Sequence, residues 1–360
     1  MAHSNRRSFL AATAASIWAA NVAAGNASAA QRIKVGQIGT KHAHASGKLE
    51  TIRKFPEIFD VIGVVEDDAE QKARVAATKS FQDLPWMTQE QLLNVPDLQL
   101  VLVETDIDNL LPVAELCISA GNHIHLDKPA GTSLTHFQKI CAAADSKQLA
   151  LQMGYMFRGN PAFRFLFQAV REGWLGDIFQ IHGEISKKVD DATRHELARY
   201  RGGAMFELGC HLLDAVVTIL GKPKSVTAFN SNTRAGTDNL MDNCLAVLRY
   251  DRAAATIKSS VCEVDGTQRR QFVVCGTLGT ISIQPLEPAQ LMLTLEKPTG
   301  THERGTHQVA LRASTGRYDG DLLHLAAVIR GDAPPEFNTA HDLAVQEAVL
   351  AASEMPLSGK

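Results

Sequence analysis

The sequence lacks the features that would assign it at once to a membrane, nucleic-acid or metal-binding class. Beyond residue 30, no apolar run reaches the roughly 18 residues that a membrane-spanning helix needs, so no membrane span is expected. The net charge is only −3, which provides no basic excess to attract nucleic acid or a membrane surface. The six cysteines form no C-x-x-C pair and have no metal-like spacing, so most of them are interpreted as small buried residues.

The composition that is present is typical of a globular protein. Of the 360 residues, 45% are hydrophobic and 21% are charged. A single hydrophobic core stops growing near about 250–300 residues, so two domains are expected. No internal repeat or low-complexity tract is found after residue 30.

Residues 1–30 have the order of parts that is typical of a twin-arginine export signal. Asn5-Arg6-Arg7-Ser8-Phe9-Leu10 resembles its consensus, an alanine-rich stretch without acidic residues follows, and Ala27-Ser28-Ala29 is an A-x-A cleavage site. An amphipathic or disordered leader is the alternative. The first interpretation predicts a periplasmic protein that uses the export machinery. Because that route carries folded proteins, a nucleotide cofactor would be loaded before export and held tightly.

Residues 31–153 predict a doubly wound parallel sheet of the Rossmann type. Short apolar strands alternate there with helices, which is the pattern of α/β proteins. Strands are expected at residues 32–39, 60–65, 98–103, 123–126 and 149–153, and helices at residues 45–54, 71–78, 110–120 and 137–145.

Residues 154–360 predict an α+β domain with an open, mainly antiparallel sheet. Runs of consecutive strands that follow helices favour this arrangement. Strands are expected at residues 178–186, 225–230, 244–250, 253–261, 271–275, 279–283 and 290–295. Helices are expected at residues 161–172, 204–220, 321–330 and 339–354.

The first strand–helix turn is a candidate site for the pyrophosphate of a dinucleotide, because N–H groups at a helix N-terminus attract anions. Gly36 and Gly39 match the start of the glycine fingerprint, but Lys41 and His44 occupy its next two glycine positions. Lys41 would either hinder a phosphate or bind it through the ammonium group. A tight turn without nucleotide is the alternative.

Glu66 ends the second predicted strand, where a carboxylate can accept hydrogen bonds from the ribose hydroxyls. Its charge would repel a 2′-phosphate, so NAD is favoured over NADP. Because Asp67 and Asp68 follow, a solvated acidic loop is the alternative.

His42 and His44 have the spacing of a metal-binding pair. Two histidines on a turn without a nearby third ligand are more often not a metal site. We therefore expect no metal in this protein.

Two further segments carry candidate catalytic groups. Lys128 follows Asp127 at the carboxyl end of a predicted strand, where ligands bind in open α/β sheets. Its pKa would fall readily with desolvation or a nearby positive charge, which suits proton transfer. An exposed loop lysine is the alternative.

The second of these segments is the predicted helix at residues 204–220. Glu207, His211 and Asp214 follow each other there at i, i+4 and i+7, so one helix face would present all three. An imidazole between two carboxylates is a candidate general acid or base near neutral pH. A charged helix surface is the alternative, although the surrounding residues are almost all apolar, which indicates a buried helix.

In combination, these segments resemble the Gfo/Idh/MocA family of oxidoreductases. The resemblance rests on residues 35–39, 66, 105, 120–123, 127–129, 154–161 and 202–214, which occur in the order and spacing of the family. It implies a first domain that binds NAD(P) and a second domain that often mediates oligomerisation, as a dimer or tetramer. The residues implied in cofactor binding are Gly36, Gly39, Thr40, Lys41, His42, Glu66, Thr105, Asp127 and Lys128.

The resemblance also implies a reaction. Lys128 and His211 match the family's conserved lysine and catalytic histidine, and Glu207 matches an acidic residue that is usually Asp. The reaction would transfer a hydride between a sugar or polyol carbinol and the nicotinamide, with His211 or Lys128 handling the hydroxyl proton. The substrate side would include Tyr155, Arg158, His211 and Asp214. Two alternatives are an NAD-dependent glycosidase that acts by transient oxidation and a non-catalytic sugar-binding relative.

Overall fold

The structure is a computed structural model that describes residues 31–312 and 315–357. Residues 32–360 form one compact unit. The predicted signal peptide at residues 1–30 lies outside the described residues. None of the helices in the described ranges has the length and apolar character needed to cross a bilayer.

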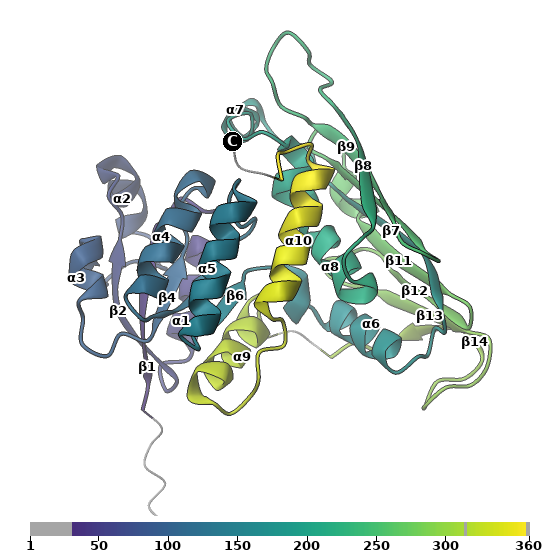
Figure 1. The fold of residues 1–360 in the computed structure, drawn as a ribbon, viewed down its shortest axis with the longest axis horizontal. Coiled ribbons are helices and arrows are strands. Elements are labelled where there is room, and N and C mark those ends of the chain that lie inside the picture. The colour runs from purple at the N-terminus through teal and green to yellow at the C-terminus, as the bar shows by residue number, and fades with distance from the viewer. Residues whose placement is uncertain (1–30, 313–314, 358–360) are drawn as a thin grey trace, which may run out of the picture. The chain divides into compact units, whose positions relative to one another are not determined.

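The first part of the chain forms a six-stranded parallel sheet with the strand order β3-β2-β1-β4-β5-β6. It confirms the predicted Rossmann sheet. Its strands are β1 (Ile33–Ile38), β2 (Phe59–Val65), β3 (Trp86–Met87), β4 (Leu100–Val103), β5 (His123–Leu126) and β6 (Leu151–Met153). Its helices are α1 (Ala45–Lys54), α2 (Ala69–Ala76), α3 (Gln89–Leu93), α4 (Ile107–Ser119) and α5 (Leu134–Ser146). Figure 1 shows this layer in purple and blue.

The burial of the central strands explains why the sequence predicted them. All four residues of β4 are buried, as expected for a central parallel strand covered by helices on both faces. The sequence missed β3 and α3 because a two-residue strand and a five-residue helix have no periodicity to detect. Helix α3 is fixed instead by a capping box between Thr88 and Gln91.

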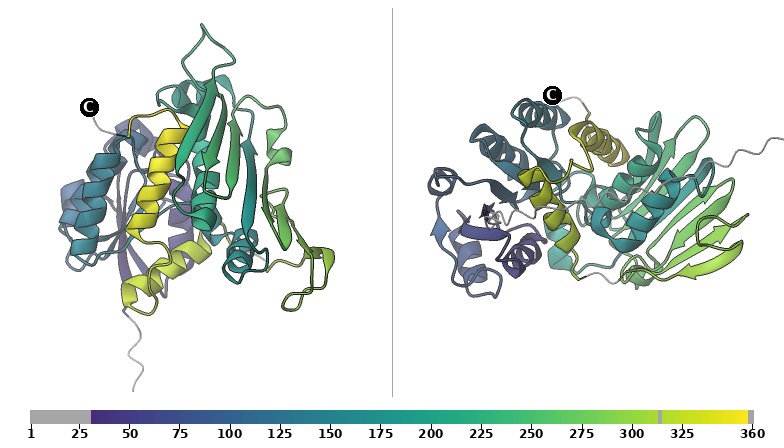
Figure 2. Two further views of the ribbon diagram at one scale, coloured as in Figure 1. Left: turned by 45° about the vertical axis from the view of Figure 1, so that its right-hand side comes forward. Right: turned by 90° about the horizontal axis from the view of Figure 1, so that it is seen from below.

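An eight-stranded mixed sheet follows, in the order β14-β13-β12-β11-β7-β10-β9-β8. Its neighbours pair antiparallel, as predicted, except for the parallel pair β7–β10. The strands are β7 (Ile178–Ser186), β8 (Ser225–Ser231), β9 (Asn243–Arg249), β10 (Ala254–Ser260), β11 (Gln271–Gly276), β12 (Gly279–Ile283), β13 (Leu291–Leu295) and β14 (Gly305–Val309). The views of Figure 2 show helices against one face of this sheet.

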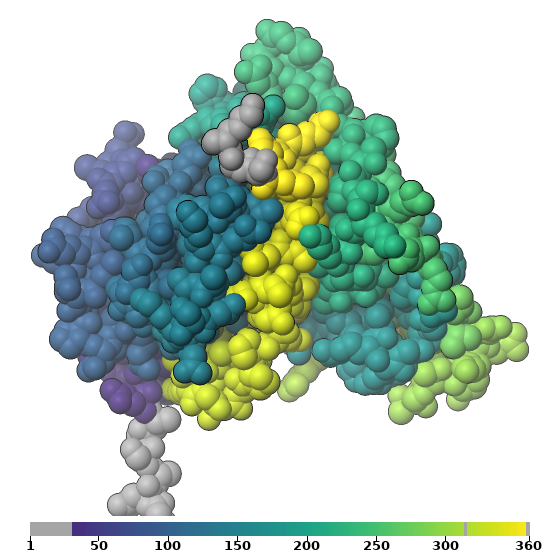
Figure 3. Space-filling view, in the orientation of Figure 1, coloured from purple at the N-terminus to yellow at the C-terminus, as the bar shows by residue number. Residues whose placement is uncertain are grey.

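The remaining helices follow β6. They are the short 3₁₀ turns η1 (Met156–Gly159) and η3 (Gly266–Arg269), α6 (Pro161–Arg171), α7 (Asp191–Leu197), α8 (Cys210–Leu220), α9 (Asp319–Arg330) and α10 (Thr339–Ala352). Of these, η1 and α6 lead from the first sheet to the second. Helix α9 returns to the first sheet, where Leu322 and Leu325 join the core of β1 and β4. Helix α10 contacts α5 on one side and α8 on the other, and Figure 3 shows it in yellow along the surface. The domain boundary predicted at residues 153 and 154 stays a prediction.

The helix predicted at residues 204–220 is not regular. Its first turn, η2 (Met205–Gly209), is a π-helix, and the α-helix α8 begins only at Cys210. Gly203 precedes the turn with φ of +50°, and a Cβ there would lie 2.0 Å from the carbonyl oxygen of Met241. Only glycine permits this approach. Single π-turns inside helices frequently mark functional sites.

Candidate active site

A groove of about 340 Å³ lies at the carboxyl ends of β1, β2 and β4, which we call the dinucleotide groove. In open parallel sheets, ligands bind at this edge. The predicted cofactor residues Gly39, Lys41, Glu66 and Thr105 line it, together with Ile38, Val65, Asp67, Asp68, Gln89, Asp106, Asn109, Pro112, Val113 and Leu116. The fold therefore brings together, at one edge, residues that are distant in the sequence.

The loop after β1 can hold an anion. Gly39 has φ of +91°, and a Cβ there would lie 2.5 Å from the backbone nitrogen of Thr105, so the loop passes against the end of β4. Within the described residues, the backbone N–H groups of Lys41 and Ala43 donate no hydrogen bond. Free N–H groups before a helix N-terminus suit a pyrophosphate, so this loop fits a dinucleotide.

Glu66 fixes the same loop from the side of β2. Its Oε2 accepts hydrogen bonds from the backbone nitrogen of Thr40, at 3.0 Å, and from the Thr40 hydroxyl, at 2.7 Å. Lys41 points to Asp68, with 2.9 Å between ammonium and carboxylate. The ammonium group of Lys41, which the sequence suggested as a phosphate ligand, is thus already paired with Asp68 in this structure.

Gly36 and Gly39 have different surroundings. Gly36 lies inside β1, and a Cβ there would come within 2.6 Å of the Leu92 side chain. Gly36 does not line the dinucleotide groove. The structure therefore places it where β1 packs against α3.

A buried cluster of charged groups, the Asp127 cluster, lies between α1 and the ends of β4 and β5. Lys48 Nζ donates to Glu104 Oε1 at 2.6 Å and to Asp127 Oδ2 at 2.7 Å, and all three side chains are fully buried. His42 Nδ1 lies 2.7 Å and His44 Nδ1 3.3 Å from the same oxygen of Asp127. These five residues hold the loop of β1 against the strand that carries Lys128.

The charges of this cluster support each other. Burial alone would lower the pKa of Lys48, but the negative charges of Asp127 and Glu104 outweigh it and raise that pKa. Burial alone would raise the pKa of Asp127, and the neighbouring His42 and Lys48 lower it well below its usual range. Sequence reasoning missed Lys48 and Glu104, because only their tertiary neighbours distinguish them from ordinary surface residues.

The ammonium group of Lys128 meets the π-turn η2. Lys128 Nζ donates to the carbonyl oxygen of Glu207 at 2.8 Å and lies 3.6 Å from Glu207 Oε1. Burial would lower the pKa of Lys128, but the Glu207 carboxylate overcompensates and raises it. Burial would raise the pKa of Glu207, and the positive charges of Lys128 and Lys187 lower it to about 2. Lys128 and Glu207 therefore form a charged pair at neutral pH.

His211 is enclosed by aromatic rings next to this pair. The ring centroids of Tyr155, Phe157 and His44 lie 6.0, 5.8 and 6.1 Å from that of His211. Burial and the charge of Lys128 lower the pKa of His211 well below its usual range, so the imidazole is neutral at pH 7. Three buried polar atoms in this region have no hydrogen-bond partner: Tyr155 OH, Glu207 Oε2 and His211 Nδ1.

The structure does not place the imidazole of His211 between two carboxylates. Neither Glu207 nor Asp214 exchanges a hydrogen bond with it in the described part of the chain. Asp214 pairs instead with Arg158, whose Nη2 donates to Asp214 Oδ1 at 2.6 Å and to Asp342 Oδ1 at 2.5 Å. The expected substrate residues thus form two groups, Tyr155 with His211 and Arg158 with Asp214.

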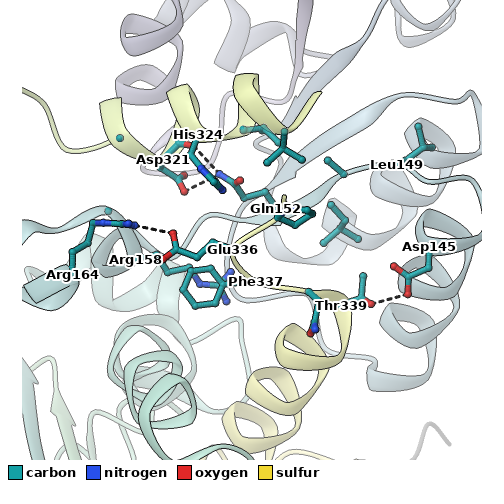
Figure 4. Close-up of a pocket in the computed structure, with 18 residues that line it drawn as sticks. Asp145, Leu149, Gln152, Arg158, Arg164, Asp321, His324, Glu336, Phe337 and Thr339 are labelled. Carbon is teal, nitrogen blue, oxygen red and sulfur yellow. Dashed lines mark hydrogen bonds and ion pairs between the residues drawn. The ribbon is translucent and has the colours of Figure 1, made fainter. Parts of the chain in front are cut away.

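Arg158 also lines a separate cavity of about 310 Å³ between β6, α9 and the start of α10 (Figure 4). Around this cavity, Gln152 donates to Asp321 at 2.8 Å and Arg164 donates to Glu336 at 2.8 Å. Lys128, Glu207 and His211 do not line it. It is therefore distinct from the candidate active site.

The buried neutral imidazole predicts a dependence of stability on pH. The unfolded chain protonates His211 below about pH 6.5, whereas the folded chain does not, so unfolding takes up a proton there. We expect His211 to lower the free energy of unfolding by about 2 kcal/mol between pH 7 and pH 5. Urea unfolding at both pH values measures this, and His211→Asn should remove that part of the difference. If the free energy of unfolding of His211→Asn changed between pH 7 and pH 5 as much as that of the native chain, the assignment to His211 would be wrong.

Comparison with known proteins places this geometry in a family. Residues 33–155 match the NAD-binding Rossmann fold of an oxidoreductase family, and residues 163–282 match the Gfo/Idh/MocA C-terminal domain. The uncharacterized oxidoreductase YdgJ of Escherichia coli is 26% identical over 72% of this chain and 73% of its own. The trans-1,2-dihydrobenzene-1,2-diol dehydrogenase of Bos taurus is 24% identical over 68% and 70%. The structure of levoglucosan dehydrogenase with NADH and levoglucosan has a TM-score of 0.77 at 16% identity, covering 90% of this chain and 97% of that one.

The parallel sheet with its dinucleotide groove, the mixed sheet and the buried lysine are the features of a nucleotide-binding oxidoreductase. The two matched domains and the relatives are all of one family. The chain belongs to the Gfo/Idh/MocA family of oxidoreductases, as its motifs indicated.

Proposed function

We propose that this protein transfers a hydride between NAD and a carbinol carbon of a sugar or polyol. The observation that carries the proposal is the Lys128–Glu207 pair beside the neutral, buried His211. When bound, the nicotinamide supplies or accepts the hydride. Oxidation of an alcohol then needs a base for the hydroxyl proton and a cation beside the oxygen.

The protonation states assign these two tasks. Glu207 keeps Lys128 charged, so Lys128 donates a hydrogen bond to the substrate oxygen and stabilises its developing negative charge. His211 is neutral and its Nδ1 has no partner, so it can accept the hydroxyl proton. Lys128 would thus act as the electrophile and His211 as the base.

The orphaned polar atoms support a substrate with several hydroxyl groups. Tyr155 OH, Glu207 Oε2 and His211 Nδ1 are buried without partners, which is costly unless a ligand satisfies them. A sugar or polyol offers hydroxyls that both donate and accept. The similar diol and levoglucosan dehydrogenases support the same class of substrate.

The acidic lining of the dinucleotide groove favours NAD over NADP. Among the residues that line the groove, one is basic, Lys41, and four are acidic: Glu66, Asp67, Asp68 and Asp106. A 2′-phosphate bound there would therefore meet an excess of negative charge. We expect NADP to bind at least about 10-fold more weakly than NAD, and Glu66→Gln to reduce that ratio. Fluorescence titration of both nucleotides measures it. Equal affinities in the native chain would contradict the expectation.

The first test of the function is mass spectrometry of the nucleotide released by denaturing freshly purified protein. Stoichiometric NAD(H) is expected, because the export signal favours a cofactor that stays bound. The loaded protein is then screened with sugars and polyols for the change in nicotinamide absorbance. A protein that binds no nucleotide would overturn the proposal. Cleavage of an aryl glycoside without a net absorbance change would replace it by the glycosidase alternative.

We also propose that the protein is exported to the periplasm by the twin-arginine route. The order of twin arginine, alanine-rich stretch and A-x-A site supports this. Cell fractionation tests it: the chain should be periplasmic, and Arg6→Lys/Arg7→Lys should stay in the cytoplasm. Equal distribution of both proteins would contradict export by this route.

The outer face of the mixed sheet supports a homo-oligomer. Phe229 on β8 is 60% exposed and lies opposite Leu245 on the neighbouring strand β9, which is 37% exposed. Exposed apolar side chains gathered on one sheet face typically mark an interface. We expect a dimer or tetramer in light scattering and dissociation by Phe229→Lys. Val264→Lys, at an exposed apolar residue outside the strands, is the matched control. A monomeric native chain would contradict the proposal.

A further inference from the structure

His42, His44 and Asp127 form a compact group that the proposed reaction does not explain. One ligand atom from each side chain lies within 4.8 Å of the others. The sequence offered only the two histidines, and the absence of a third ligand argued against a metal. The structure supplies that ligand from the end of β5.

The contacts of His42 direct its Nδ1 at the carboxylate of Asp127. Its Nε2 lies 3.1 Å from the carbonyl oxygen of Lys128, which can only accept, so Nε2 carries a proton. Its Nδ1 accepts from the backbone nitrogen of His44 at 3.3 Å and lies 2.7 Å from Asp127 Oδ2. His42 Nδ1 and the Asp127 carboxylate therefore face each other directly while Nε2 is fixed on the backbone, which is the orientation of an imidazole that binds a metal through Nδ1.

A second buried oxygen points to the same place. Glu104 Oε2 is fully buried, has no hydrogen-bond partner and lies 3.9 Å from His42 Nδ1. The only ammonium group at this point of the described chain, that of Lys48, bridges Glu104 Oε1 and Asp127 Oδ2. Asp127 Oδ2 and the buried Glu104 Oε2 thus both lie beside His42 Nδ1.

We propose that His42, His44 and Asp127 bind a divalent transition-metal cation, with zinc the best match. Imidazole nitrogen and carboxylate oxygen are ligands that zinc prefers, and three protein ligands leave a fourth position open. The Nε2–H of His42 on a backbone carbonyl and Lys48 on Asp127 have the arrangement of outer hydrogen bonds that orient metal ligands. The ring centroids of His211 and Tyr318 lie 6.1 and 5.8 Å from that of His44, so both side chains are close to the proposed ligand.

The test measures the metal alone, without nucleotide or substrate, so that it is independent of the proposed reaction. The untagged chain is dialysed against chelator and titrated with Zn²⁺ in a competition assay with a chromogenic chelator. Co²⁺ is titrated separately and followed by its visible absorption. We expect one metal ion per chain and the bands of a four-coordinate cobalt site. His44→Gln should weaken zinc binding by about 100-fold or more.

The control is His136→Gln, which removes a histidine that pairs with Glu115 at the surface of α5. It should bind zinc as the native chain does. Because His44→Gln replaces a side chain with few exposed atoms, circular dichroism must show that it is folded, and His42→Gln provides a second test of the same site. Absence of stoichiometric binding, or equal binding by the native chain, His42→Gln and His44→Gln, would overturn the proposal.

Discussion

Replacement of Lys128 by methionine is expected to lower kcat by about 10²–10⁴-fold with the best carbinol substrate. Lys128 pairs with Glu207, and its raised pKa keeps it charged where the substrate oxygen gains negative charge. Methionine retains the length of the buried stem but not the ammonium group. The loss should therefore appear mainly in kcat rather than in the affinity for NAD.

The measurement is steady-state turnover by nicotinamide absorbance, with NAD binding measured separately. Lys139→Met, on the exposed side of α5, is the matched control and should retain full activity. Thermal unfolding separates a catalytic loss from a folding defect. The variant is expected to fold, because the Glu207 carboxylate that loses its partner is partly accessible to water. A folded Lys128→Met protein with native turnover would show that the ammonium group is not part of the chemistry.

Replacement of Arg158 by methionine is expected to reduce the free energy of unfolding by about 3–5 kcal/mol. Arg158 holds Asp214 and Asp342, and all three side chains are at most 3% exposed. Burial would lower the pKa of Arg158, but the two carboxylates raise it, so it is charged throughout. Removing the cation leaves two buried carboxylates close together, with the His341 ring 3.4 Å from Asp214 in place of the guanidinium group.

Urea unfolding measures this change, and Arg164→Met provides the control. Arg164 pairs with Glu336 at 2.8 Å, but half of its side chain is exposed, so its loss should cost less than about 1 kcal/mol. The comparison also separates two roles for Arg158. A stable Arg158→Met protein with a raised KM would assign Arg158 to substrate binding instead of to the interior of the fold.

The sequence alone predicted the elements with strong periodicity. The helix at 45–54 and the strand at 178–186 were placed with the bounds that the structure has, because apolar alternation and helical spacing persist over many residues. Short elements such as β3 and α3 were missed, and the π-turn was predicted as regular helix. Hydrophobic pattern does not distinguish the two forms of helix over five residues.

The motifs also indicated the candidate catalytic residues. Lys128, Glu207 and His211 come together in the structure, although 79 residues separate Lys128 from Glu207. Arg158 and Asp214 were expected beside the substrate on the basis of the same resemblance, and the structure pairs them with each other. A charged residue in a sequence motif does not by itself reveal which oppositely charged group will pair with it.

The sequence by itself therefore determined the class of protein. It predicted the parallel sheet with its dinucleotide-binding turn, the mainly antiparallel sheet, and the family whose motifs contain Lys128 and His211. The tertiary structure decided the electrostatics. Lys48 and Glu104 became buried partners of Asp127, and His42 and His44 came to lie beside the same carboxylate, only because α1 begins and β4 and β5 end at the same edge of one sheet. Local patterns follow from neighbours along the chain, whereas burial and charge pairing depend on neighbours in space, which no short stretch of sequence contains.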